Sequence, residues 1–291
     1  MQDKPVALVT GANKGIGLQI AKDLVAHGFI VLVGSRNLEH GGTAAKSIGA
    51  DARALQLDVT NQASIATAAE RIRNEFGRLD VLVNNAAISH AGKPGRPLEE
   101  MAKSGRLSFV SLDEVRAVFE TNVFGVIELM RASLPTMRRQ RSGMIINVSS
   151  GGGIYGVPAM SIYSASKFAL EGFSEAVSYE LASQNIVVKL IEPHGGVTAT
   201  NFNARVAEDS GDVRAVADYD QFKADMREAY SRTAAASSIS SRDVALEIYK
   251  AATDGSRRLR YFIGADSRGF LNAKQTLPDQ EYIEFMRNYF R

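Results

Sequence analysis

The sequence predicts an α/β fold, a doubly wound parallel sheet of about seven strands with helices on both faces. Short apolar segments alternate with longer stretches of helical periodicity, a pattern typical of a parallel sheet with crossover helices. Glycine or polar residues directly follow these apolar segments, at the strand ends where open α/β sheets bind ligands. Because we find no linker and no internal repeat, we expect residues 1–291 to form one domain.

The expected strands are short and rich in apolar residues. They cover residues 5–9, 29–33, 52–57, 79–83, 144–148, 186–191 and 260–263. Helical periodicity follows residue 16 and recurs over about 62–76, 112–139 and 163–183. Two segments, 88–111 and about 199–241, are longer than ordinary connections. We expect them to form an extended loop and a substrate-side lid that shape substrate choice.

The composition is that of a soluble globular protein, with 45% hydrophobic and 23% charged residues. A net charge of +2 gives no reason to expect a nucleic acid or an acidic membrane as partner. The chain has no cysteine and its four histidines are isolated, so we expect no disulfide and no metal site. The apolar run near the N-terminus is too short for a signal peptide or a membrane span, and we expect a cytoplasmic enzyme.

A glycine-rich turn follows the first expected strand and precedes a helical pattern. Its residues are Thr10, Gly11, Ala12, Asn13, Lys14, Gly15, Ile16 and Gly17. Glycines let the backbone approach a pyrophosphate, whose charge then lies against the amide groups of a helix N-terminus. The order strand, turn and helix is the context that a dinucleotide-binding loop needs, although glycine also marks any tight turn.

The second expected strand ends at Ser35 and Arg36, where many NAD-binding units carry an acid that holds the ribose 2′-hydroxyl. Here there is no acid, and Lys14 of the glycine-rich turn offers a second cation. Two cations suit a 2′-phosphate, so we predict NADP(H) as the cofactor. The alternative is that both side chains are merely exposed charges.

Tyr163 and Lys167 lie four residues apart at the start of a helical pattern, so their side chains should fall on one helix face. A fixed ammonium favours the phenolate, and we therefore expect the pKa of Tyr163 to lie below its reference value of about 10. Such a tyrosine can give and take a proton near neutral pH. The alternative is an incidental helix pair, which is common.

Taken together, these motifs resemble the short-chain dehydrogenase/reductase family over about the first 200 residues. The resemblance rests on motifs in a fixed order, namely Thr10-Gly11-x-x-x-Gly15-Ile16-Gly17, Asp58, Asn84-Asn85-Ala86-Ala87, Asn122, Ser150 and Tyr163-x-x-x-Lys167. It implies a Rossmann-like fold, a nicotinamide cofactor and a homodimer or homotetramer.

The resemblance also implies roles for single residues. Tyr163 would be the acid/base, Ser150 would orient the substrate oxygen, Lys167 would lower the pKa of the tyrosine and bind the nicotinamide ribose, and Asn122 would hold a water in the proton relay. Ser150 is preferred to Ser149 because family members place this serine 13 residues before the tyrosine. The implied cofactor contacts are Thr10, Gly11, Asn13, Lys14, Gly15, Ile16, Gly17, Ser35, Arg36, Asp58, Val59, Asn84, Ala86, Tyr163, Lys167 and Pro193, with Thr198 or Thr200.

Three residues mark departures from the family pattern or candidates for substrate contact. His194 stands where the family has a glycine after the proline, which leaves the register of the following threonines open. His194 is a candidate substrate contact, although a plain loop histidine is the simpler interpretation. Tyr155 is expected to line the substrate loop, and Ala87 replaces a glycine, a small change that should be tolerated.

The sequence therefore predicts an NADP(H)-dependent oxidoreductase that interconverts a carbonyl and a secondary alcohol of a small molecule by hydride transfer. The same fold also hosts epimerases, dehydratases and proteins that only sense NADP(H). A complete serine, tyrosine, lysine and asparagine set argues against a sensor, because a binding module has no use for a tuned phenol.

Overall fold

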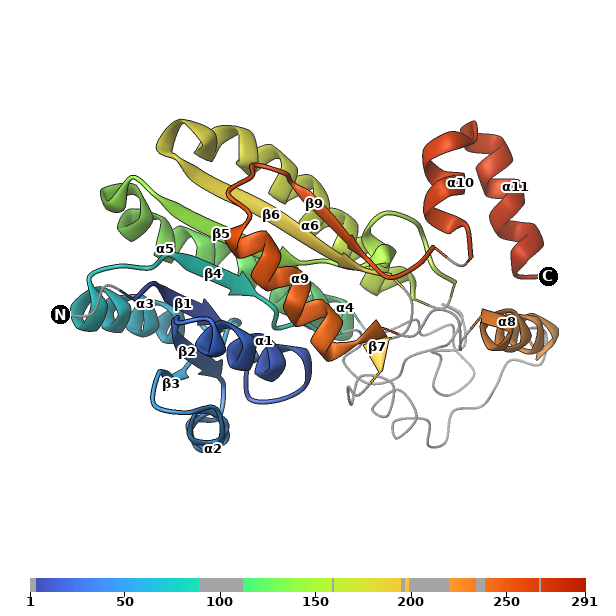
Figure 1. Ribbon diagram of the computed structural model, residues 1–291. Helices are drawn as coiled ribbons and strands as arrows, with labels where there is room; N and C mark the ends of the chain where they lie inside the picture. The colour runs from blue at the N-terminus through green and yellow to red at the C-terminus, as the bar shows by residue number, and fades with distance from the viewer. Residues whose placement is uncertain are drawn as a thin grey trace.

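Figure 1 shows the computed structural model, which describes residues 4–88, 112–158, 160–194, 197–198, 220–233, 239–266 and 268–291. A seven-stranded parallel sheet lies between two layers of helices. Its strands are β1 (Val6–Val9), β2 (Ile30–Ser35), β3 (Ala52–Gln56), β4 (Val81–Asn84), β5 (Gly143–Val148), β6 (Ile186–Pro193) and β9 (Arg260–Ile263). The predicted fold class, a Rossmann-like doubly wound sheet, is confirmed.

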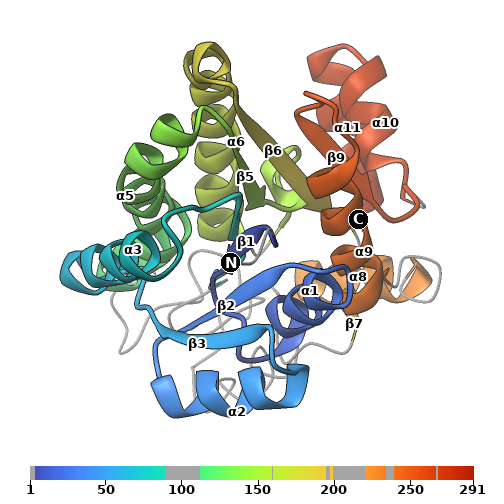
Figure 2. The ribbon, with the colours of Figure 1, turned by 60° about the vertical axis from the view of Figure 1, so that its left-hand side comes forward.

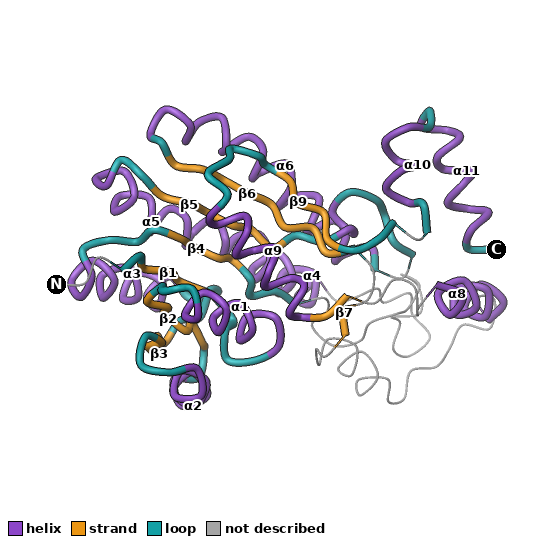
Figure 3. Tube along the Cα trace, viewed as in Figure 1, coloured by secondary structure: helices purple, strands orange, loops and turns teal. Residues whose placement is uncertain are grey.

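The strand order in the sheet is β3-β2-β1-β4-β5-β6-β9. The chain first builds outward from β1 to β3 and then returns to place β4 on the other side of β1, where Leu8 pairs with both Leu32 and Leu82. This change of direction lies at the carboxyl ends of β1 and β4, where sheets of this topology bind their ligands. Figure 3 shows the loops that leave these strand ends.

Helices cover both faces of the sheet because each has one apolar side (Figure 2). Helices α1 (Gly15–Ala26), α2 (Leu38–Ile48) and α9 (Ser241–Thr253) pack on one face, where Ile20, Leu24 and Ile248 are buried. Helices α3 (Gln62–Phe76), α5 (Gly125–Gln140) and α6 (Ser161–Leu181) pack on the other.

The long helix expected over 112–139 is present but is interrupted in its middle. Helix α4 (Leu112–Phe119) continues into a π-helical turn, η2 (Glu120–Phe124), and then into α5. The backbone of Gly125 lies close to the loop after β3, since an added Cβ there would lie 2.5 Å from the carbonyl oxygen of Val59. A π-helical turn of this kind often marks a functional position, and Asn122 lies within it.

A third apolar cluster lies beyond the carboxyl ends of the strands, on the side of the molecule where α8, α10 and α11 are drawn in Figure 1. Helices α8 (Asp220–Thr233), α10 (Phe270–Thr276) and α11 (Asp279–Tyr289) contribute to it, with Phe270 fully buried at its centre. The short strands β7 (Val197–Thr198) and β8 (Ile239–Ser240) pair with each other, and Ile239 is buried in the core that α1 and α9 share. The expected loop at 88–111 and most of the expected lid at 199–241 lie outside the described residues.

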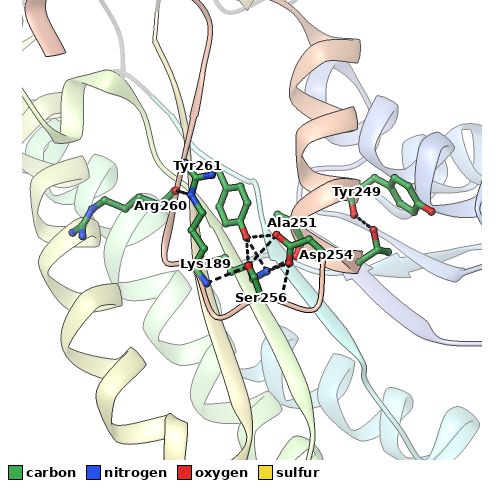
Figure 4. Close-up of polar contacts among 9 residues, drawn as sticks. Lys189, Tyr249, Ala251, Asp254, Ser256, Arg260 and Tyr261 are labelled. Atoms are coloured by element: carbon green, nitrogen blue, oxygen red, sulfur yellow. Dashed lines mark hydrogen bonds and ion pairs between the residues drawn. The ribbon is translucent and has the colours of Figure 1, made fainter. Parts of the chain in front are cut away.

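A buried lysine ties α9 to the sheet (Figure 4). Lys189 lies in the middle of β6, and its Nζ donates to the carbonyl oxygen of Ala251 at 2.7 Å, to Asp254 Oδ1 at 2.6 Å and to Tyr261 Oη at 2.9 Å. A buried ammonium is tolerated because all three of its protons have acceptors. The network fixes the C-terminal end of α9 against β6 and β9. Among the described helices, none combines the length and apolarity that a membrane span requires.

Candidate active site

The glycine-rich turn between β1 and α1 has the backbone shape that a pyrophosphate requires. Gly11 and Gly15 have left-handed φ values of +62° and +55°, which favour glycine. Gly17 has no room for a side chain, because an added Cβ would lie 2.5 Å from both the Asn85 side chain and the Gly11 carbonyl oxygen. Within the described residues the Lys14 side chain does not cap α1. The first backbone N–H groups of α1 thus suit a bound anion, and these residues fit a dinucleotide.

Thr10 holds the ends of β1 and β4 together. Its buried Oγ1 accepts hydrogen bonds from the backbone N–H groups of Asn85 and Ala86, each at 2.9 Å. The Asn85 side chain returns a bond to the carbonyl oxygen of Thr10 at 2.8 Å. Thr10 therefore shapes the crevice through the backbone of its neighbour. Asn85, a residue that the sequence did not assign, does the same.

The predicted 2′-phosphate residues lie on two adjacent loops. Arg36 follows β2 directly and is exposed, while Ser35 is buried and donates its hydroxyl to the carbonyl oxygen of Asn37 at 2.8 Å. The two loops meet where the N–H of Ala12 donates to the Gly34 carbonyl oxygen at 3.0 Å. Lys14, on the first loop, is also exposed. The hydroxyl of Ser35 is thus used within the turn, and Arg36 and Lys14 extend exposed cationic side chains from the two loops.

Asp58 and Asn84, two further predicted cofactor residues, are already bonded within the protein. Asp58 Oδ1 accepts from the backbone and hydroxyl of Thr60, and Val59 beside it is nearly buried. Asn84 Nδ2 donates to Asn147 Oδ1 at 2.8 Å in the sheet interior, and Asn147 continues to Ser174. The Asn84 side chain therefore braces β4 against β5.

Ser150 and Tyr163 meet at the end of β5. Ser150 follows this strand, and its Oγ accepts from the N–H of Gly152 at 3.2 Å within a 3-10 turn, η3 (Gly151–Gly153). Tyr163 lies in the first turn of α6 and hydrogen-bonds the Ser150 side chain. Ser149 points elsewhere, since its buried Oγ has no partner among the described residues.

Lys167 lies one helical turn beyond Tyr163 and is buried. Its Nζ donates to the carbonyl oxygen of Val148 at 2.8 Å and lies 5.7 Å from the centroid of the Tyr163 ring. Burial lowers the pKa of Lys167 to about 8, an effect that the nearby Glu171 carboxylate partly offsets. The lysine thus remains an ammonium at neutral pH.

The pKa of Tyr163 moves in the direction opposite to the sequence prediction. Burial raises it above its ordinary value of 10, and the hydrogen bond with Ser150 offsets this only in part. The expected fall is therefore wrong, because loss of solvation outweighs the effect of the hydrogen bond with Ser150. The spacing in the sequence identifies Lys167 as a neighbour of Tyr163, but it does not show how deeply the phenol is buried.

Asn122 connects the π-helical turn to the segment that follows β4 and to α6. Its Oδ1 accepts from the N–H of Ile88 at 2.9 Å, and its Nδ2 donates to the carbonyl oxygen of Ile88 at 2.8 Å and to Ser166 Oγ at 3.0 Å. Both donor positions of the Asn122 amide are thus used within the protein, and the water that the resemblance assigns to this residue stays a prediction. The side chain positions Ile88, the last residue before the undescribed segment.

Tyr155 and His194 both pack against Gly151, next to Ser150. An added Cβ on Gly151 would lie 2.5 Å from Tyr155 Oη and 2.8 Å from His194 Cβ. Burial raises the pKa of Tyr155 to about 12 and lowers that of His194. The Tyr155 ring stacks edge-on against Phe270, with centroids 5.4 Å apart. Both candidate substrate residues are thus largely covered by protein.

The remaining predicted cofactor residues lie at the end of β6. Pro193 is the last residue of this strand and pairs with Ile263. Thr198 lies in β7 and pairs with Ser240 of β8, and Thr200 lies outside the described residues. In the part of the chain that the structure describes, no group of three or more histidine, aspartate or glutamate side chains is placed to hold a metal ion.

A family model described as short chain dehydrogenase matches residues 5–211. The chain belongs to this family. Among curated short-chain dehydrogenase relatives, 3-ketodihydrosphingosine reductase of Bacteroides thetaiotaomicron is 39% identical over 71% of this chain and 69% of its own length. The 3-oxoacyl-(acyl-carrier-protein) reductase of Salmonella typhimurium is 36% identical over 70% and 78%. Retinol dehydrogenase 8 of Bos taurus is 38% identical over 72% and 64%.

Solved structures of short-chain dehydrogenases resemble the whole fold. One from Streptomyces avermitilis matches with a TM-score of 0.77 at 30% identity, covering 99% of this chain and 97% of its own. A metagenomic short-chain oxidoreductase in complex with NADP gives 0.65 at 28% identity, covering 89% and 96%. A Burkholderia phymatum enzyme in complex with NAD gives 0.73 at 23% identity, covering 98% and 95%, a likeness of fold alone.

Sequence reasoning missed several buried polar residues of this short-chain dehydrogenase. Asn147 had a signal, since it is a polar residue inside the apolar run of β5, and it links Asn84 to Ser174. Glu192 had a similar signal, an acid near the end of the apolar strand β6. Ser166 had none, because a serine in a helix is unremarkable until the partner, here Asn122, is known.

Proposed function

We propose that this short-chain dehydrogenase is an NADP(H)-dependent oxidoreductase that interconverts a carbonyl and a secondary alcohol, with Tyr163 as acid/base. The observation that carries the proposal is the arrangement of Ser150, Tyr163 and Lys167. The serine hydrogen-bonds the phenol, and the lysine ammonium lies 5.7 Å from the phenol ring. These residues lie at the carboxyl end of β5, on the edge of the sheet that also holds the glycine-rich turn.

The cofactor, when bound, supplies the hydride, and the chain supplies a proton and the orientation of the substrate. In reduction the Tyr163 hydroxyl donates its proton to the carbonyl oxygen as the carbon receives the hydride. A raised pKa keeps this phenol protonated at neutral pH, which suits a proton donor. The Lys167 ammonium then stabilises the phenolate that forms, and the Ser150 hydroxyl orients the substrate oxygen. The two relatives named as reductases support this direction.

Preference for NADP(H) is supported by the side chains around the glycine-rich turn. Lys14 and Arg36 are exposed on adjacent loops, and neither Ser35 nor Arg36 is the acid that would repel a 2′-phosphate. The fit of the turn itself applies equally to NAD, and the two cofactor complexes among the structural neighbours contain one of each. The preference for NADP(H) over NAD(H) is therefore proposed on the basis of Lys14 and Arg36, and not of the turn.

The experiment mixes the protein with NADPH and a panel of carbonyl compounds and follows the loss of NADPH absorbance. The panel includes 3-ketodihydrosphingosine, a 3-oxoacyl thioester and retinal, chosen from the names of the relatives. Turnover of at least one carbonyl is expected. Tight NADPH binding without any turnover would favour a cofactor sensor instead, and a change of stereochemistry or loss of water without net oxidation would favour an epimerase or dehydratase.

We also propose that the protein forms a homodimer or homotetramer. Large aromatic side chains are exposed on α6, namely Phe168 and Tyr179, and at the end of η2, namely Phe124. Exposed apolar side chains of this size would be covered in a subunit interface. Light scattering on the purified protein would test this, and a monomer at micromolar concentration would contradict it.

A further inference from the structure

Two buried glutamates, Glu171 and Glu192, form ion pairs with the same arginine, Arg260. Glu171 lies on α6 one helical turn after Lys167, and Glu192 lies on β6; their exposed fractions are 6% and 0%. Arg260 of β9 places its Nε 3.2 Å from Glu171 Oε2 and 3.4 Å from Glu192 Oε1. The Nη2 atom of Arg260 pairs with Glu175, which is partly exposed. One guanidinium therefore faces two buried carboxyl groups.

The buried side-chain oxygens and nitrogens without a hydrogen-bond partner, among the described residues, all come from this place. They are Ser149 Oγ, Glu171 Oε1 and both oxygens of Glu192. Ser149 and Glu171 meet at Gly153, where an added Cβ would lie 2.9 Å from Ser149 Oγ and 3.1 Å from Glu171 Cγ. Two ionised carboxylates offer each other only acceptors, which explains the missing partners. A proton on one of them supplies a donor.

Glu192 is the carboxyl that holds this proton. Burial and the neighbouring Glu171 carboxylate raise its pKa to about 9, although Arg260 and Arg258 act in the opposite direction. The pair then carries a single negative charge at neutral pH, and Arg260 Nε lies 3.2 Å from Glu171 Oε2 and 3.4 Å from Glu192 Oε1. Two like charges in a dry site cannot both ionise without a large cost.

Glu171 lies four residues after Lys167 on α6, so the two side chains fall on the same face of the helix. Burial lowers the pKa of this lysine, and Glu171 is the acid that raises it. Among the described residues, the other titratable or charged groups that face the lysine and its acid are Tyr163 and Glu175 on α6, Glu192 on β6, Arg260 on β9 and Arg258 just before it. Gly151–Gly153 of η3, which also pack against α6, carry no charge.

We propose that Glu171 is a positioning residue whose negative charge, fixed by Arg260 and kept single by a proton on Glu192, holds Lys167 in its ammonium form. This inference rests on the proposed function only in that Lys167 assists Tyr163. The alternative role is purely structural, in which the Arg260 ion pairs join β9 to α6. The two roles differ in what happens to the lysine when the acid becomes neutral.

The decisive measurement follows Lys167 directly in the protein without cofactor. Lysine labelled with ¹³C at Cε gives a signal whose shift reports protonation, and the Lys167→Arg variant identifies the signal of Lys167. The wild type should titrate with a midpoint near 8, and Glu171→Gln should move the midpoint down by about 1 pH unit. Glu171→Asp keeps the negative charge, so its Lys167 midpoint should lie close to that of the wild type. Lys189, whose acid partner is Asp254, serves as an internal reference.

Glu175→Gln is the matched control, because it removes an acid from the same arginine at a more exposed position. It should leave the Lys167 midpoint within about 0.3 pH unit of the wild type. If Glu171→Gln fails to fold, Glu171→Leu also removes the charge and fills the space with apolar atoms. A midpoint that stays near 8 without the Glu171 charge, or that moves equally in Glu175→Gln, would overturn the inference.

Activity separates this inference from the proposed function. The fall of kcat/KM for reduction at high pH should begin about 1 pH unit lower in Glu171→Gln than in the wild type. A shifted midpoint in a protein without any turnover would leave the inference standing and remove the proposed function. Turnover in the wild type together with an unshifted Lys167 midpoint in Glu171→Gln would leave the proposed function standing and overturn the inference.

Discussion

The Nζ atom of Lys167 donates a hydrogen bond of 2.8 Å to the carbonyl oxygen of Val148, the last residue of β5. This bond fixes the first turns of α6 against the end of the strand. Ser149 and Ser150 follow Val148 immediately, so the position of the lysine and the position of the serine depend on the same strand end. The geometry around Tyr163 is therefore set by β5 and α6 together.

Tyr163→Phe should lower kcat by at least about 100-fold, because the variant has no proton to donate to the carbonyl oxygen. NADPH affinity should change little, since the phenyl ring keeps its place on α6. Stopped-flow binding and steady-state kinetics would measure both. Tyr249→Phe, on α9 at the opposite face of the sheet, is the control and should behave like the wild type. A variant without Tyr163 that kept the wild-type rate would remove the acid/base role.

Arg36→Asp should shift cofactor preference from NADPH toward NADH. The variant loses one charge-assisted bond to the 2′-phosphate and gains a charge that repels it. The kcat/KM value for NADPH divided by that for NADH should therefore fall by about 10-fold to 100-fold. Lys22→Asp makes the same change of charge on the exposed side of α1 and should leave the ratio as it is. An unchanged ratio in Arg36→Asp would contradict the 2′-phosphate assignment.

The rate of reduction should fall as pH rises through about 8. Lys167 is an ammonium below its pKa of about 8 and loses its charge above it, so the stabilisation of the phenolate is lost on the alkaline side. A profile of kcat/KM from pH 6 to 10 would show this limb. Lys167→Arg, which stays charged across the range, should be slower but should lack the limb near 8. A limb that persists in this variant belongs to another group.

Glu192→Gln should stabilise the protein at alkaline pH. The folded protein holds the Glu192 proton up to about pH 9, whereas the ordinary pKa of 4.5 applies after unfolding. Between these values the folded state binds more protons, so stability falls as pH rises toward 9. An amide has no proton to lose, and Tm at pH 8.5 should rise by a few degrees. Thermal melts at pH 5 and pH 8.5, with Glu180→Gln as an exposed control, would check this. If Tm depended on pH in the same way in the wild type and in Glu192→Gln, Glu192 would not hold a proton in the folded protein.

Local patterns in the sequence were enough for the strands and the main helices. The sheet follows from short apolar runs between helical periods, and the cofactor turn follows from the glycines before α1. The Tyr163 and Lys167 pair follows from helix geometry, which the structure confirms by placing both at the start of α6. The same spacing left open how the two groups affect each other, and the predicted fall in the pKa of Tyr163 was wrong because burial dominates.

The sequence by itself determined the fold and the chemical identity of the groups along the crevice, because periodicity and turn chemistry are local properties of the chain. Only the tertiary structure decided which polar groups are used internally. Asn84 bonds Asn147 across the sheet, and Asn122 holds Ile88. It also placed Glu171 and Glu192 together behind Lys167, although they belong to a helix and a strand. Burial and contacts between distant segments set the protonation of these groups, and both arise when the chain folds.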